Sequence, residues 1–70
     1  MARRVVITQD DDGTGGWAFV GEVWDVAGDG TKELVTSANS AIGGATGISP
    51  WQIFINGASF VLDQMSDSLS

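Results

Sequence analysis

The chain has 70 residues, of which nine are acidic and three are basic, so its formal net charge is −6, and it contains neither cysteine nor histidine. This charge repels phosphate backbones and anionic lipids, which argues against direct binding to nucleic acid or to a membrane and leaves basic proteins as compatible partners. The absence of cysteine and histidine removes disulfides and the usual structural zinc ligands. We expect one small domain over residues 1–70, of marginal stability by itself.

The first half of the chain predicts a three-stranded antiparallel meander. β-Branched and aromatic residues, which favour strands, concentrate at about 3–9, 17–26 and 32–37. The segments between them are rich in glycine and aspartate, which favour turns. Because these connections are short, neighbouring strands are expected to pair antiparallel.

An isolated glycine interrupts the second predicted strand at Gly21. Glycine inside a strand often marks a bulge, where one extra residue changes which face the following side chains occupy. A bulge here would place Trp24 on the same face as Trp17 and Phe19. The sequence therefore predicts a bent central strand.

The acidic segment after the first strand partly matches a calcium-binding loop. Thr8, Asp10, Asp12 and Gly13 have the spacing of its first ligands and its glycine. However, the first ligand position holds threonine, and Phe19 stands where a bidentate glutamate is needed. The segment is therefore expected to be a hairpin loop, with cation binding left open.

Residues 38–47 are almost all small, with Ile42 as the exception. This composition predicts a long connection that carries the chain across to the other side of the sheet. Loops of such length are often functional or ordered by a partner. The segment 37–49 also allows close backbone approach to a neighbouring molecule.

The last segment predicts a helix over about 50–66. Ser49 stands at the N-cap position, Pro50 at the first helical position, and Gln52 completes a capping box. The apolar residues that follow recur every three or four positions, as on one side of a helix. This predicted stripe consists of Trp51, Phe54, Ile55, Ala58, Val61, Leu62, Met65 and Leu69.

The same residues also alternate, which is compatible with a hairpin of strands 51–55 and 58–62 around Asn56-Gly57. That alternative gives an all-β fold of five short strands. The helix leaves Ile53 and Phe60 on its polar side, but the capping residues and the continuation of the pattern through Met65 favour it. The predicted fold is therefore α+β, with the helical stripe packed against Trp17, Phe19 and Trp24 of the meander.

Catalytic and cofactor chemistry have few candidates in this composition. Histidine, cysteine and tyrosine are absent, which removes the commonest general base, the thiolate nucleophile and the phenol. The glycine-rich segments do not match the spacing of a dinucleotide or phosphate loop. We expect no enzyme, no cofactor and no dedicated metal site.

The favoured hypothesis is a non-enzymatic structural or assembly protein that self-associates or docks as a small accessory subunit on a larger complex. A cytoplasmic location is expected, because no apolar run has the length of a signal-peptide core or a membrane span. An accessory protein of a virus particle fits this description. The candidate interface residues are Ile53, Phe60, Ile42, Trp17 and Trp24.

Two other functions fit parts of the sequence. An acidic decoy that inhibits a nucleic-acid-binding enzyme needs carboxylates along one face, and Asp10–Asp12 with Asp63 and Asp67 are the candidates. A sugar-binding module would use Trp17 and Trp24 as stacking platforms.

Overall fold

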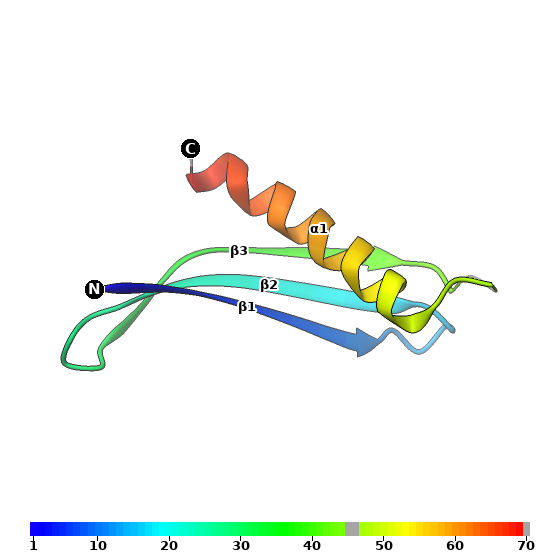
Figure 1. Ribbon diagram of the computed structural model, residues 1–70, viewed down its shortest axis with the longest axis horizontal. Helices are drawn as coiled ribbons and strands as arrows, with labels where there is room; N and C mark the ends of the chain where they lie inside the picture. Colours follow the sequence, from blue (N-terminus) through cyan, green and yellow to red (C-terminus); the bar gives the residue numbers. More distant parts are fainter. Residues whose placement is uncertain (45–46, 70) are drawn as a thin grey trace.

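The computed structural model describes residues 1–44 and 47–69. Within them the chain forms strands β1 (Ala2–Asp11), β2 (Trp17–Val26) and β3 (Lys32–Ile42), followed by helix α1 (Pro50–Leu69). The strands make one antiparallel sheet in the order β1-β2-β3, and α1 crosses one face of it diagonally (Figure 1). The predicted α+β fold is confirmed, and the five-stranded alternative is wrong.

The helix begins as its capping residues predict. The backbone N–H of Gln52 donates to Ser49 Oγ at 3.1 Å, and the N–H of Ile53 donates to the Ser49 carbonyl at 3.1 Å. The second half of the predicted capping box is not formed, because the Gln52 side chain donates instead to Asn56 Oδ1, one turn further along. The side chain of Ser49 therefore satisfies the amide of Gln52, one of the amides left free at the start of α1.

Two strands are longer than their composition predicted. β1 extends to Asp11 and β3 to Ile42, so the loop expected over 38–47 is wrong for residues 38–42. These small residues pair regularly with β2, which supplies backbone hydrogen bonds that outweigh their weak strand preference. Residues 45 and 46 of the expected loop lie outside the described residues.

The predicted bulge at Gly21 is also wrong. β1 and β2 pair without interruption over their whole length, so the side chains of β2 alternate regularly between the two faces. The irregularity lies between β2 and β3, where Trp24 pairs with Leu34 while Val23 pairs with Thr36, which leaves Val35 as the extra residue. Trp24 therefore lies on the face opposite to Trp17 and Phe19, and not under α1.

Two glycines allow α1 to lie close to the sheet. The fully buried ring of Phe19 occupies the space where a Cβ atom of Gly57 would stand. On the sheet, a Cβ atom at Gly21 would lie 2.7 Å from Met65 Cε and 3.1 Å from Val61 Cγ2. The lack of a side chain at Gly57 therefore allows α1 to approach the sheet closely. The dipeptide Asn56-Gly57 had pointed instead to a hairpin turn.

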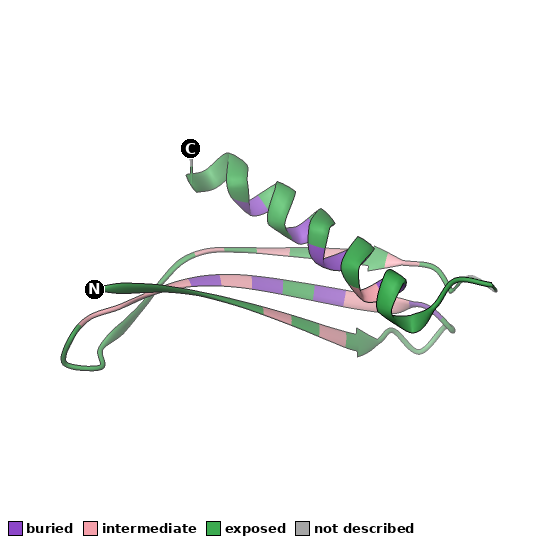
Figure 2. Cartoon of the chain, viewed as in Figure 1, coloured by how far each residue is buried: buried purple, intermediate pink, exposed green. Residues whose placement is uncertain are grey.

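The helix faces the sheet with a different side from the one predicted. Its buried residues follow a line one turn apart, with Ala58 beside it (Figure 2). At about 100° per residue, this side is rotated by roughly 60° from the predicted stripe. Ile53 is only 9% exposed, which corrects its expected outward position, while Trp51, Ile55 and Leu62 are exposed. The buried line consists of Ile53, Gly57, Val61 and Met65.

We predict that Gly57→Ala destabilises the protein by about 1–3 kcal/mol, because the new methyl group must displace the buried ring of Phe19. In an exposed helix the same change would stabilise by up to about 1 kcal/mol. Urea unfolding followed by circular dichroism at 222 nm measures the effect. Ser59→Ala, at an exposed position of α1, is the matched control and should change stability by a few tenths of a kcal/mol. A G57A variant as stable as the parent would contradict the packing of Phe19 on Gly57.

Candidate functional site

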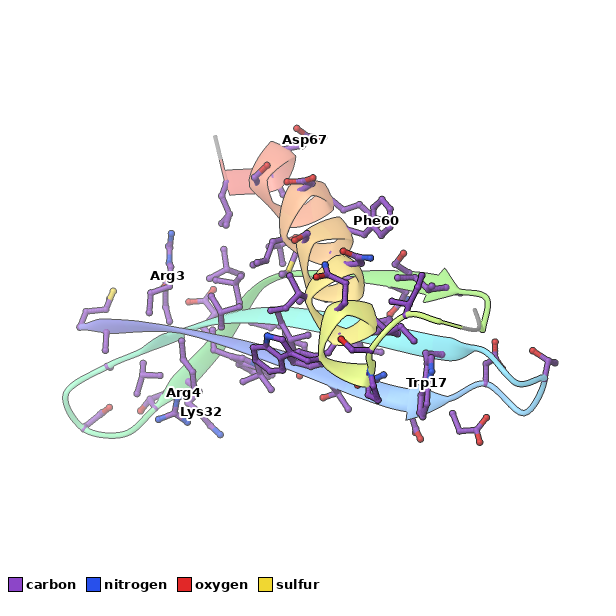
Figure 3. The ribbon with its side chains drawn as sticks, turned by 45° about the vertical axis from the view of Figure 1, so that its right-hand side comes forward. Arg3, Arg4, Trp17, Lys32, Phe60 and Asp67 are labelled. Carbon is purple, nitrogen blue, oxygen red and sulfur yellow. The ribbon has the colours of Figure 1, made fainter. Side chains whose placement is uncertain are left out.

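The five candidate interface residues do not form one surface. Ile53 belongs to the core with Phe19, and Trp17 and Ile42 pack against that core from the sheet. Trp24 lies on the opposite face of the sheet, so Trp17 and Trp24 do not form a single stacking platform. Phe60 is 53% exposed and projects from α1 on the side away from β1 (Figure 3). The structure thus brings three of the five together, inside the fold.

The face of the sheet opposite α1 carries apolar side chains that no second layer of the described chain covers. We call this surface the open face; Arg4, Trp24 and Leu34 lie side by side across it. Lys32 Nζ stands 5.7 Å from the centre of the Trp24 ring, and Figure 3 shows Arg4 and Lys32 on the side of the sheet away from α1. The exposed apolar residues of the open face are Val6, Val20 and Leu34.

A second uncovered apolar surface lies along one side of α1. Trp51, at 69% exposure, stacks on Phe54, whose ring in turn lies 6.3 Å from that of Phe19. By helical geometry this side lies roughly 140–180° around the axis from Phe60, and therefore faces β1. We call it the outer helix flank, and it consists of Trp51, Ile55, Leu62 and Leu69.

The third surface is the β1 edge, meaning the side of Ala2–Asp11 that faces away from β2. β1 is an outer strand, and α1 packs mainly against β3 and β2 and only slightly against β1. As a result Val5 is 48% exposed, although it points toward the helical side of the sheet. The backbone of this edge and the side chains above it are therefore open to a partner.

The acidic segment forms a hairpin loop that its own carboxylates hold together. Asp12 Oδ1 accepts hydrogen bonds from the backbone N–H of Thr14 at 2.8 Å, from Thr14 Oγ1 at 2.7 Å and from the N–H of Gly16 at 3.1 Å. These bonds, chiefly those from Thr14, lower the pKa of Asp12. Asp11 Oδ1 likewise accepts from the N–H of Gly13 at 2.7 Å. Among the described residues, no three acidic side chains are grouped so that they could hold a metal ion.

Two other aspartates are held ionised by local partners. Arg3 and Asp25 face each other across β1 and β2 in a two-pronged pair of 2.8 and 3.2 Å, which lowers the pKa of Asp25 and raises that of Arg3. In the β2–β3 turn, hydrogen bonds from Thr31 lower the pKa of Asp29. Asp63 and Asp67 lie one turn apart on exposed positions of α1, as the decoy hypothesis requires, and that hypothesis stays a prediction.

Comparisons with protein-family models, with curated proteins and with solved structures found no match to this chain. The described residues enclose no pocket, and none of their helices has the length and apolarity needed to span a membrane. What they offer is the open face, the outer helix flank and the β1 edge. Of these surfaces, sequence reasoning had singled out only Trp24, which lies on the open face. It missed the other two, because the roll of a helix and the outer position of a strand follow from how the elements pack.

We predict that the free energy of unfolding decreases as the pH falls below about 4, near the ordinary aspartate pKa of 3.8. The folded-state pKa values of Asp12, Asp25 and Asp29 are lowered, so their stabilising contribution is complete above that pH and is lost as the carboxylates become protonated. Urea midpoints between about pH 2 and 7 measure this dependence. Asp12→Asn should flatten it, whereas Asp63→Asn changes the charge equally but leaves the loop intact. An identical pH dependence in D12N and the parent would contradict the role of Asp12.

Proposed function

We propose that this protein is a non-enzymatic structural or assembly subunit that associates with further copies of itself. The observation that supports this most directly is the imbalance between its core and its surface. Among the described residues, six hydrophobic residues are buried while twelve large ones are exposed. Contiguous apolar surface on a small chain is typical of a protein interface.

The layer structure supports the same proposal. A sheet with apolar side chains on both faces is stable when each face packs against another layer. Here α1 covers one face only. Val20 and Leu34, on the open face, are 40% and 45% exposed. A second copy would remove such side chains from water, at about 25 cal/mol for each Å² of apolar surface.

The size of the chain also favours association. A core of this extent gives a 70-residue chain little stability, and there is no disulfide to add more. Binding to a further copy would stabilise the folded form by mass action, so folding and association should be coupled. Such coupling is expected of an assembly subunit whose interface buries apolar side chains that its own core leaves exposed.

Light scattering after size exclusion, over about a hundredfold range of concentration, tests the proposal. We expect a discrete multiple of the 7.3 kDa chain mass, and an unfolding temperature that rises with concentration. A folded monomer throughout the range would overturn the proposal. A mass that grows without reaching a defined value would also overturn it, because indiscriminate aggregation is not assembly.

A further inference from the structure

We propose that two copies of this chain join along the β1 edge, with their β1 strands antiparallel, to form one six-stranded sheet from two three-stranded ones. This inference rests on the self-association proposed above and assigns one surface to it. β1 pairs with β2 along Ala2–Asp11 and has no strand on its other side within the described residues (Figure 1). A strand with unpaired backbone groups is a template for a further strand.

The backbone groups available at this edge can be identified. The N–H of Asp12 donates to the Gly16 carbonyl at 3.3 Å, which makes 12 and 16 a hydrogen-bonded pair at the end of the β1–β2 ladder. Such pairs alternate in antiparallel strands, so even-numbered residues of β1 bond to β2 and odd-numbered ones direct their N–H and C=O outward. The hydrogen bonds at the other end of β2 are consistent with this assignment. There the N–H of odd-numbered Ala27 donates to the Thr31 carbonyl, on the side of β3, so the even-numbered residues of β2 are the ones that bond to β1. Residues 3, 5, 7 and 9 therefore present free N–H and C=O groups at the β1 edge, whereas the N–H of Asp11 donates to Asp10 Oδ1 at 2.9 Å.

The charges of β1 select one register for this pairing. The strand is basic where it begins, at Arg3 and Arg4, and acidic where it ends, at Asp10 and Asp11, with no charge between them. If Ile7 of one copy lies opposite Ile7 of the other, each arginine faces an aspartate of the second copy. Opposite charges at directly facing positions stabilise such a pair of strands, and like charges destabilise it.

The facing side chains also share a face of the sheet. Arg4 and Asp10 both belong to the open face, so in this register they meet there twice, once at each end of the junction. The Arg4 guanidinium makes no hydrogen bond or ion pair with the rest of the described chain. Arg3 is already paired with Asp25 on the helical side, so Arg4 and Asp10 are the informative pair.

The same arrangement turns the outer helix flank toward the second copy. Antiparallel pairing of two identical edges places the two-fold axis perpendicular to the sheet, so both helices lie on the same side of it. The outer helix flank faces β1, and it would therefore face the second copy across the junction. The half-exposed Val5 lies beneath this space, on the helical side of β1. One junction thus pairs the β1 edge and turns the outer helix flank toward the second copy.

The other edge of the sheet is less suited to pairing. β3 is interrupted by the extra residue Val35, and a bulge of this kind hinders the addition of a strand. Its charged residues, Lys32 and Glu33, lie together at one end, so antiparallel self-pairing finds no matching charge at the other. β1 is regular over its whole length and carries opposite charges at its two ends.

Exchange of the two charges tests this register. Arg4→Asp places aspartate opposite Asp10 at both ends of the junction, and Asp10→Arg places arginine opposite Arg4. Each variant alone should raise the dissociation constant of the dimer about tenfold or more, because two facing pairs become like-charged. An equimolar mixture of R4D and D10R should dimerise about as tightly as the parent, since both facing pairs are then opposite in charge. Light scattering over a range of concentrations measures these dissociation constants, and chains with tags of different mass distinguish the mixed dimer from dimers of one variant.

Two further measurements guard against indirect effects. Lys32→Asp changes the net charge as much as R4D does, but away from β1, and should leave the dissociation constant of the dimer within about twofold of the parent value.

Hydrogen exchange followed by NMR provides a readout that needs no variant. In the dimer the amides of Val5, Ile7 and Gln9 should be protected, and their protection should be lost on dilution, whereas the amides of Val6 and Thr8 bond to β2 in either state.

A dimer unaffected by R4D and D10R, with the odd-numbered amides of β1 unprotected, would overturn the β1 junction and leave the proposed self-association standing. Failure of the mixed variants to restore dimerisation would overturn the register. A folded monomer at every concentration would overturn both this inference and the proposed function.

Discussion

The contact between the Phe19 ring and Gly57 decides how the helix lies on the sheet. The ring is fully buried and takes the place of a side chain at Gly57, so the backbone of α1 descends onto the centre of β2. The next contact along the helix repeats the arrangement in reverse, with Val61 and Met65 of α1 above Gly21 of β2. Each element thus supplies a glycine where the other supplies bulk, which gives a small fold close packing without a large core.

This packing leaves much apolar surface uncovered. Because α1 faces the sheet with the side that carries Gly57, its other apolar side, the outer helix flank, is turned away from the sheet and toward β1. Because α1 lies on one face of the sheet, the open face has no second layer among the described residues (Figure 2). The surfaces proposed for association are therefore consequences of the same contact that holds the monomer together.

The charged residues of the turns and those along β1 have different roles. In the turns, the carboxylates of Asp12 and Asp29 bond to nearby amides and hydroxyls, so their role is local. Along β1, Asp10 accepts a hydrogen bond from the adjacent N–H of Asp11, but among the described residues neither Arg4 nor Asp10 is paired with a charged side chain of another strand. The proposed second copy would supply that partner. The composition alone would explain the excess of acidic residues by solubility. Along the β1 edge, however, basic residues stand at one end and acidic residues at the other.

Local signals in the sequence determined the elements of this protein. The β-branched runs predicted the three strands, the aspartates and glycines predicted the turns, and Ser49-Pro50 predicted where the helix begins, because each of these preferences acts over a few neighbouring residues. Only the tertiary structure decided which sides of these elements meet. The roll of α1, the face of Trp24 and the extension of β3 to Ile42 depend on the fit of Phe19 to Gly57 and on pairing with β2, between residues far apart in the chain. Periodicity describes how apolar residues are spaced, whereas the absence of a side chain at Gly57 determined which of two apolar sides lies against the sheet.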